Sequence, residues 1–115
     1  MKTLELGNLD SQRDWGHAKD YVRAMHLILN HEKADDFIIS TGEAHSIRDL
    51  CKLVFSKLGM NYEEYVKINP KYLRPEELDY LCGDSSKARK TLGWKPKYSF
   101  EMIVEEMLEY FLKII

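Results

Sequence analysis

The sequence predicts an α/β fold in which about four helices alternate with short strands. Apolar residues recur at helical spacing over residues 17–31, 46–58 and 99–115, and a shorter helical stretch precedes Gly93. Between these stretches, runs of a few residues alternate in polarity or are continuously apolar, as strands are. At 115 residues the chain is long enough for one small domain, and it shows no internal repeat.

The first elements are two short strands and a helix. Residues 3–8 (TLELGN) alternate weakly and end in Gly-Asn, which predicts a strand that enters a turn. Residues 13–15 (RDW) are predicted to form a second extended piece. The helix over residues 17–31 is predicted by apolar residues at helical spacing, namely Ala18, Tyr21, Val22, Met25, Ile28 and Leu29.

A strand and a capped helix are predicted next. Phe37–Ile39 is a continuous apolar run, typical of a strand covered on both faces of a mostly parallel sheet. Ser46 and Asp49 have the spacing of a capping box, with Asp49 where glutamate or glutamine is usual. The apolar stripe that follows predicts a helix that ends at Gly59.

The next segment is predicted to be extended. Residues 65–69 (YVKIN) alternate as a half-buried strand does, and residues 78–82 are expected to add another short strand. Pro70 and Pro75 enclose a segment that is therefore predicted to be extended or turning.

Two helices complete the chain. Asp84 or Ser85 is expected to cap a helix that ends at Gly93. Ser99 is expected to cap the last helix, whose apolar residues keep a helical period to Ile115.

Composition argues against several classes of protein. A net charge of -2 provides no overall electrostatic attraction for nucleic acid or an anionic membrane. The apolar runs are far shorter than the roughly 20 residues that span a bilayer, and the N-terminus has no apolar signal segment. We therefore expect a cytoplasmic protein in which Cys51 and Cys82 are reduced.

Several catalytic and cofactor motifs are missing. The six glycines never approach the spacing of a dinucleotide-binding or phosphate-binding loop. No tyrosine is followed by a lysine four residues later, which removes the Tyr-Lys pair of short-chain dehydrogenases. The histidines form no metal-binding motif, and adjacent acid pairs such as Glu105-Glu106 are predicted to be solvated because neighbouring side chains diverge.

Two arginines and one glutamate form a candidate nucleotide site. Arg13 stands at the start of a predicted helix, and Arg74 lies in the proline-bounded segment YLRPEEL. Guanidinium groups bind phosphate through a planar fork of donors, so two of them from separate segments can hold a diphosphate. Glu77 can accept hydrogen bonds from ribose hydroxyls. A simpler interpretation stays open, in which Arg13 pairs with a neighbouring aspartate and Arg74 with a neighbouring glutamate.

In that simpler interpretation the partners are Asp14 or Asp20 for Arg13, and Glu76 or Glu77 for Arg74. Surface ion pairs of this kind contribute about 0 to 1 kcal/mol each. Spacing alone does not separate a diphosphate site from such pairs.

Three segments together resemble the C-terminal part of GDP-mannose 4,6-dehydratases, which are extended short-chain dehydrogenases/reductases of the NAD-dependent epimerase/dehydratase family. They are LELGNLDSQRDWGHAKDYV, DDFIISTGEAHSIRDL and INPKYLRPEELDYLCGDSSKARKTLGWKPKYSFEMIVEEM. The likeness covers nearly the whole chain, and its most specific part is GNLDSQRDWGHAKDYV. The resemblance implies a C-terminal, nucleotide-sugar-binding portion without the N-terminal Rossmann core.

The resemblance also implies roles for individual residues. It places Arg13 and Arg74 on the nucleotide diphosphate and Glu77 on the ribose of GDP-mannose or GDP. The family uses NADP to convert GDP-mannose to GDP-4-keto-6-deoxymannose. The cofactor loop and catalytic residues of the family precede Met1, so no catalytic residue, cofactor or metal is expected here, and the chain alone is expected not to be catalytic.

The same resemblance implies missing neighbours. Residues 17–42 are expected to pack on the absent Rossmann portion, so the isolated chain is expected to self-associate or form a homo-oligomer. Two alternatives stay open. In the first, the chain is a non-enzymatic partner or vestigial fragment that completes another chain. In the second, it is a segment of a related nucleotide-sugar epimerase, dehydratase or reductase.

Overall fold

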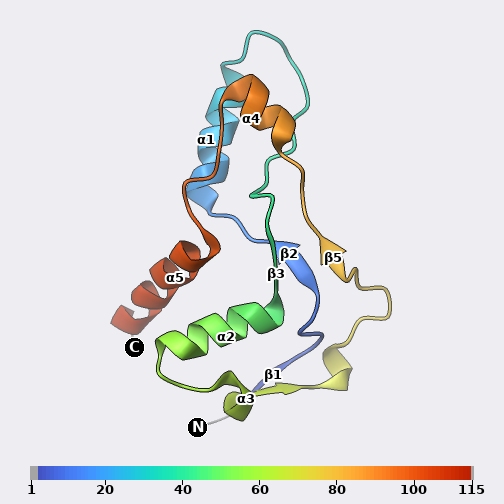
Figure 1. Cartoon of the computed structure of the whole chain (residues 1–115), viewed down its shortest axis with the longest axis vertical. Helices are drawn as coiled ribbons and strands as arrows, with labels where there is room; N and C mark the ends of the chain where they lie inside the picture. The colour runs from blue at the N-terminus through green and yellow to red at the C-terminus, as the bar shows by residue number, and fades with distance from the viewer. Residues whose placement is uncertain (1–2, 115) are drawn as a thin grey trace.

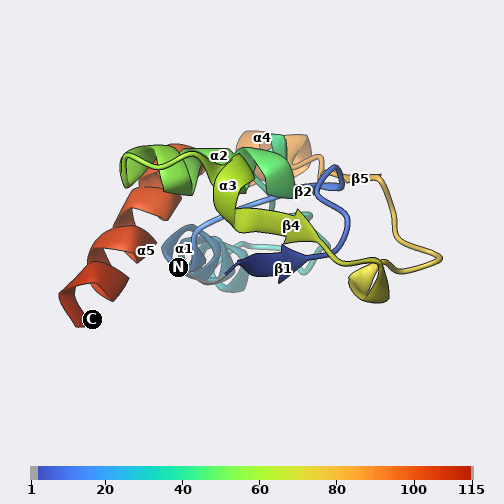
Figure 2. The ribbon, with the colours of Figure 1, turned by 90° about the horizontal axis from the view of Figure 1, so that it is seen from below.

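The computed structural model describes residues 3–114, which form a thin slab of 54 × 37 × 18 Å (Figures 1 and 2). Its radius of gyration is 17.1 Å, against about 13 Å for a compact domain of this length. The chain exposes 8483 Å² of surface, whereas a compact monomer of its mass exposes about 6,600 Å². The α/β class is confirmed, but the chain leaves much surface uncovered.

Two small sheets connect distant parts of the chain. β1 (Leu4–Leu6) pairs in parallel with β4 (Val66–Ile68). In the second sheet, β2 (Gln12–Asp14) lies between β3 (Ala44–Ser46), which is antiparallel to it, and β5 (Tyr80–Leu81), which is parallel. The strands predicted at the N-terminus, at residues 65–69 and at residues 78–82 are confirmed.

One hydrophobic cluster lies under α2 (Ile47–Lys57) and the short α3 (Tyr62–Tyr65), at the bottom of Figure 1. The predicted capping box is confirmed, because the Asp49 backbone N–H donates to Ser46 Oγ and the Ser46 N–H donates to the Asp49 carboxylate. Gly59 follows with the positive φ of 72° that a helix end requires. The buried members of this cluster are Leu9, Cys51, Phe55, Tyr62 and Val66.

A second cluster joins α1 (Ala18–Leu29) to α4 (Ser86–Leu92), at the top of Figure 1. Its fully buried members are Ala24, Ala88 and Trp94. Both predicted helices are confirmed, and Gly93 ends α4 with a φ of 67°.

The last helix, α5 (Phe100–Ile114), contacts α2 on the lower part of the molecule. Ser99 Oγ accepts a hydrogen bond from the Met102 backbone N–H, as predicted for a capping serine. Ile115 lies outside the described residues. The segment after Pro70 turns as a 3-10 helix, Pro70–Tyr72.

One predicted element needs correction, and two observed elements were not predicted. Phe37–Ile39 is not a strand, because no strand within residues 3–114 lies beside it to supply a hydrogen-bonding partner. Phe37 and Ile39 pack on the cluster between α1 and α4, whereas Ile38 is 61% exposed. Only one side of this segment is therefore uncovered. β3 and α3 were not predicted, since three or four residues carry too little periodicity to show.

One face of α1 is exposed and apolar. Val22, Met25 and Leu29 are spaced at i, i+3 and i+7 and are 61%, 65% and 83% exposed. Ile38 adds to the exposed apolar surface of this part of the chain. We call these four residues the α1 face.

Candidate functional site

An open cleft of about 410 Å³ lies where β1 ends beside the 3-10 helix. Arg74 and Glu77, both predicted site residues, line it. The other lining residues are Glu5, Leu6, Gly7, Asn8, Ile47 and Tyr72. Its size falls within the range of small-molecule sites.

Backbone pairing brings these distant residues together. The Asn69 N–H donates to the Leu6 carbonyl at 2.8 Å, which extends the β1–β4 ladder to the end of β1. The Asn69 side chain then accepts from the Lys71 N–H and starts the 3-10 helix that leads to Arg74. Gly7 permits this close approach, because a Cβ there would lie 2.6 Å from the Tyr72 carbonyl oxygen.

Arg13 reaches the same region from β2. Its Nη2 lies 3.8 Å from Glu77 Oε1, and both side chains are partly buried. The Gln12 N–H donates to the Asp79 carbonyl at 2.8 Å, which holds the segment containing Glu77 beside β2. Arg13 and Glu77 are therefore brought together, with Glu77 between Arg13 and the cleft.

The ion pairs of the simpler interpretation have other partners. Arg13 pairs with Glu77 rather than with a neighbouring aspartate, and Asp20 pairs with Arg23. Arg74 makes no ion pair within residues 3–114 and is exposed. Its guanidinium is thus available at the cleft.

Asp14 is a structural residue that sequence reasoning missed. Its carboxylate accepts the Thr41 N–H and hydroxyl at 2.9 and 2.6 Å, and the Gly42 N–H at 2.9 Å. Burial raises the pKa of the Asp14 carboxyl, but these hydrogen bonds outweigh it and hold the pKa below its ordinary value. Asp14 therefore anchors β2, the strand that contains Arg13, to the loop that follows residue 40. Only the adjacency of Asp14 to Arg13 could have signalled this role.

The turn after β2 is shaped by Trp15 and Gly16. Trp15 Nε1 donates to the His45 carbonyl at 3.1 Å. A Cβ on Gly16 would lie 1.8 Å from the Tyr21 hydroxyl, so a larger residue there would displace the Tyr21 side chain. The turn positions Arg13 and starts α1.

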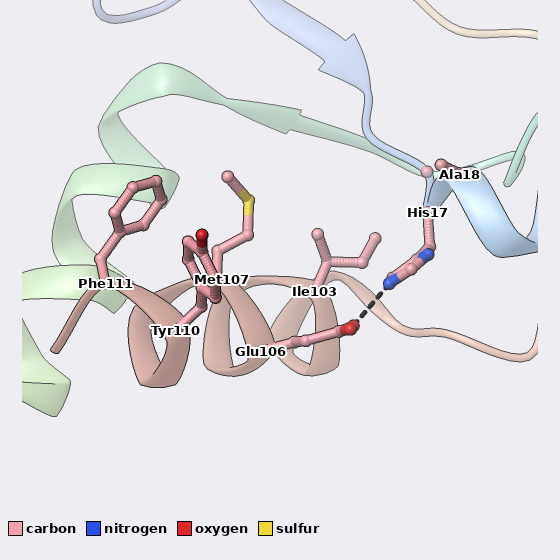
Figure 3. A pocket seen from close by; sticks show the side chains of 8 residues that line it. His17, Ala18, Ile103, Glu106, Met107, Tyr110 and Phe111 are labelled. Atoms are coloured by element: carbon pink, nitrogen blue, oxygen red, sulfur yellow. Dashed lines mark hydrogen bonds and ion pairs between the residues drawn. The ribbon is translucent and has the colours of Figure 1, made fainter. Parts of the chain in front are cut away.

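A second pocket, of about 420 Å³, lies between the start of α1 and α5 (Figure 3). At this pocket, His17 Nε2 lies 2.5 Å from Glu106 Oε2. Ile103, Met107 and Phe111 of α5 supply apolar side chains. The Lys19 N–H donates to His17 Nδ1, so His17 also caps α1. These contacts tie α5 to α1 and assign this pocket a structural role.

The predicted divergence of Glu105 and Glu106 is seen, but neither is simply solvated. Glu105 pairs with Lys57 at 2.7 Å, whereas Glu106 pairs with His17. Each therefore joins α5 to a different element.

Comparison with known families settles the relationship of the chain. The family model described as GDP-mannose 4,6 dehydratase matches residues 1–107. The chain belongs to the GDP-mannose 4,6-dehydratase family. This match favours that family over the related epimerases and reductases.

Curated members of the GDP-mannose 4,6-dehydratase family are similar over almost all of this chain. GDP-mannose 4,6 dehydratase 2 of Arabidopsis thaliana is 47% identical over 111 residues, which cover 96% of this chain and 30% of the relative. The Homo sapiens GDP-mannose 4,6 dehydratase is 42% identical, covering 94% of this chain and 34% of the relative. The chain thus spans about a third of the length of these relatives.

Solved structures share the fold. RMD from Pseudomonas aeruginosa, complexed with NADPH, has a TM-score of 0.86 at 21% identity and matches 98% of this chain and 37% of its own. A UDP-glucose 4-epimerase from Thermotoga maritima, with UDP-glucose, has a TM-score of 0.84 at 29% identity, over 97% and 35%. In each comparison this chain matches about a third of the solved chain.

Neither of the helices that follow β2 and β3 begins with the glycine-lined turn that holds a dinucleotide. β3 passes directly into α2 with no glycine between them, and Gly16, between β2 and α1, is covered by Tyr21. A pyrophosphate needs a glycine-lined helix start for close backbone approach.

From residue 3 to residue 114, no helix combines the length and apolarity needed to cross a membrane. Over the same range, no cluster of three or more histidine, cysteine, aspartate or glutamate side chains is arranged to hold a metal ion.

Proposed function

We propose that this chain is the GDP-sugar-binding part of a GDP-mannose 4,6-dehydratase. One observation carries the proposal: Arg74 and Glu77 line one cleft, and Glu77 pairs with Arg13, which lies 64 positions earlier in the chain. The family match supports GDP-mannose or GDP as the ligand.

The chemistry of the three residues suits a nucleoside diphosphate. Arg74 has a free guanidinium at the cleft, and Arg13, which pairs with the cleft residue Glu77, is a second cation. The Glu77 carboxylate holds Arg13 in place and offers its remaining lone pairs to ribose hydroxyls. Each role uses an atom that the cleft or its edge presents.

The full reaction belongs to the whole enzyme in this proposal. GDP-mannose becomes GDP-4-keto-6-deoxymannose with NADP, a step in the biosynthesis of GDP-fucose or GDP-rhamnose type sugar nucleotides. The cofactor, the catalytic tyrosine and lysine, and the acid/base residues are assigned to a cofactor-binding Rossmann portion. This chain supplies nucleotide binding, binds no cofactor and is not catalytic alone.

The α1 face is the proposed contact with that Rossmann portion. Its four exposed apolar side chains are the part of residues 17–42 that needs cover. The excess of nearly 2,000 Å² over a compact monomer is enough for a large interface.

The same face favours a second candidate, in which the chain completes a separate polypeptide without being an enzyme itself.

A cytoplasmic location is proposed for either case. It is supported by the two free thiols, Cys51 and Cys82, since free cysteines are typical of reducing compartments.

Calorimetric titration with GDP tests the diphosphate site. Arg74→Ala is expected to weaken GDP binding at least tenfold, because a charged hydrogen bond contributes about 1.5–3 kcal/mol. Arg13→Ala is expected to weaken it less, since Arg13 lies behind Glu77. Lys52→Ala removes one positive charge from the exposed side of α2 and serves as the control. Equal affinities in all four proteins would disprove the two-arginine site.

A further inference from the structure

We infer that an apolar groove between α2 and α5 holds an amphipathic helix that is supplied together with the Rossmann portion. The groove is a different surface from the nucleotide cleft and from the α1 face. The inference rests on one part of the proposed function, namely that further polypeptide completes this chain.

The groove is open, has a volume of about 520 Å³ and is lined by apolar side chains throughout. β1 and Trp15 contribute to its lining, but most of the lining comes from the two helices. Each helix presents residues to it at i, i+3 and i+7. They are Ile47, Leu50 and Val54 from α2, and Phe100, Ile103 and Met107 from α5.

The chain does not fill this groove itself. Lys57, at the end of α2, pairs with Glu101 and Glu105 in the first half of α5, at 3.2 and 2.7 Å. Beyond these pairs, α5 runs away from α2 towards its C-terminal end (Figure 2). Met107 and Phe111, which line this wider part, are therefore 57% and 50% exposed.

The groove suits a helix better than a strand. All but three of the lining residues lie on α2 or α5, and such rows of side chains accept the ridges of a third helix. β1 also has a free edge, since it pairs with β4 alone within residues 3–114. However, only Leu4 and Leu6 of this short strand line the groove. The expected occupant is thus a helix with apolar residues at helical spacing.

The exposed area and the charge indicate what supplies this helix. A buried apolar side chain removes about 60–120 Å² from water, so the α1 face accounts for at most about 500 Å² of the excess surface. An interface of standard size buries about 800 Å² per partner, and the groove supplies the further area. α5 carries four glutamates and one lysine, which favours basic residues beside the apolar stripe of the occupant. The solved chains of the same fold continue for about two-thirds of their length outside the match, which is enough chain for such a helix.

Two synthetic peptides test the groove. The first consists of leucine and lysine with leucine at helical spacing, and the second has the same composition but alternates the two residues, which favours a strand. Both are titrated into the Met25→Glu protein, so that the α1 face does not compete. Trp15 lines the groove whereas Trp94 is only 1% exposed, so a change in tryptophan fluorescence reports occupancy of the groove.

We expect the helical peptide to bind saturably and to shift the Trp15 emission to shorter wavelength, and the alternating peptide to bind at least about tenfold more weakly. Met107→Glu should weaken the helical peptide at least about tenfold, because its charge would be buried against leucine side chains. Met102→Glu places the same charge on α5 outside the groove and should change the affinity by less than about threefold.

Three results would overturn the inference: no binding of the helical peptide, equal binding of the two peptides, or equal affinities in the Met107→Glu and Met102→Glu proteins. Circular dichroism checks that both variants are folded. If Met107→Glu does not fold, the two peptides and the Trp15 signal decide. Titration with GDP separates the inference from the proposed function. GDP binding without peptide binding removes only the groove, and peptide binding without GDP binding removes only the nucleotide site.

Discussion

At the scale of single residues, the acidic side chains have different roles, which depend on the residues that surround each of them in the fold. Asp20 is only 1% exposed, and its carboxylate accepts the Lys97 and Tyr98 N–H groups at 3.0 and 3.1 Å while pairing with Arg23 at 2.8 Å. Glu77 instead faces an open cleft. Asp20 therefore stabilises the fold, whereas Glu77 is free to bind a ligand.

Replacing Asp20 tests this structural role. Asp20→Ala should lower the free energy of unfolding by about 3 kcal/mol, because two partly buried N–H groups and Arg23 lose their acceptor. Burial raises the pKa of Asp20, but the bonds from Arg23, Lys97 and Tyr98 outweigh it and lower the pKa. The stabilisation is therefore full above the unfolded pKa of about 3.9 and is lost as pH falls through the lower folded pKa.

Urea unfolding at several pH values measures both effects. Asp20→Asn cannot titrate, so its stability should depend less on pH below about pH 4 than that of the unmodified chain. Identical pH profiles for the two proteins would contradict the assigned role of Asp20.

At the scale of elements, local signals near helix ends were the most reliable. The Ser46 capping box and the glycines after α2 and α4 were predicted and are confirmed, because caps depend on residues within a few positions of each other. Phe37–Ile39 was predicted wrongly, because a strand exists only where another strand pairs with it.

The contribution of the capping box can be measured directly. Ser46→Ala should destabilise the chain by about 1 kcal/mol, since the Asp49 N–H at the start of α2 loses its acceptor. Ser56→Ala in the last turn of α2 is the matched control and should change stability by less than about 0.5 kcal/mol, because it is exposed. Thermal unfolding followed by circular dichroism compares the two, and equal shifts would argue against the cap.

At the scale of the whole molecule, the slab is too thin to bury its own apolar surface. Its thickness of 18 Å accommodates about two layers of structure, and the α1 face has nothing over it within residues 3–114. We expect the proposed Rossmann portion to cover this face or, in its absence, other copies of the chain to do so.

Light scattering across a range of concentrations tests the behaviour of the isolated chain. We expect its apparent mass to rise with concentration, because exposed apolar patches drive association. Met25→Glu places a charge in the α1 face and should reduce this rise, whereas Lys52→Glu on α2 should not. A monodisperse monomer with a sharp calorimetric melt would refute self-association.

The sequence by itself determined the α/β class, the longer helices with their caps, and the family, because each depends on local periodicity or on motifs such as RDWGHAKDYV. It also named Arg13, Arg74 and Glu77 as a candidate set. Only the tertiary structure decided that Glu77 joins Arg13 to the cleft of Arg74, and that Asn8 lines this cleft. The physical reason is that parallel pairing of β1 with β4 and of β2 with β5 joins residues more than 60 positions apart, a contact that no local pattern encodes.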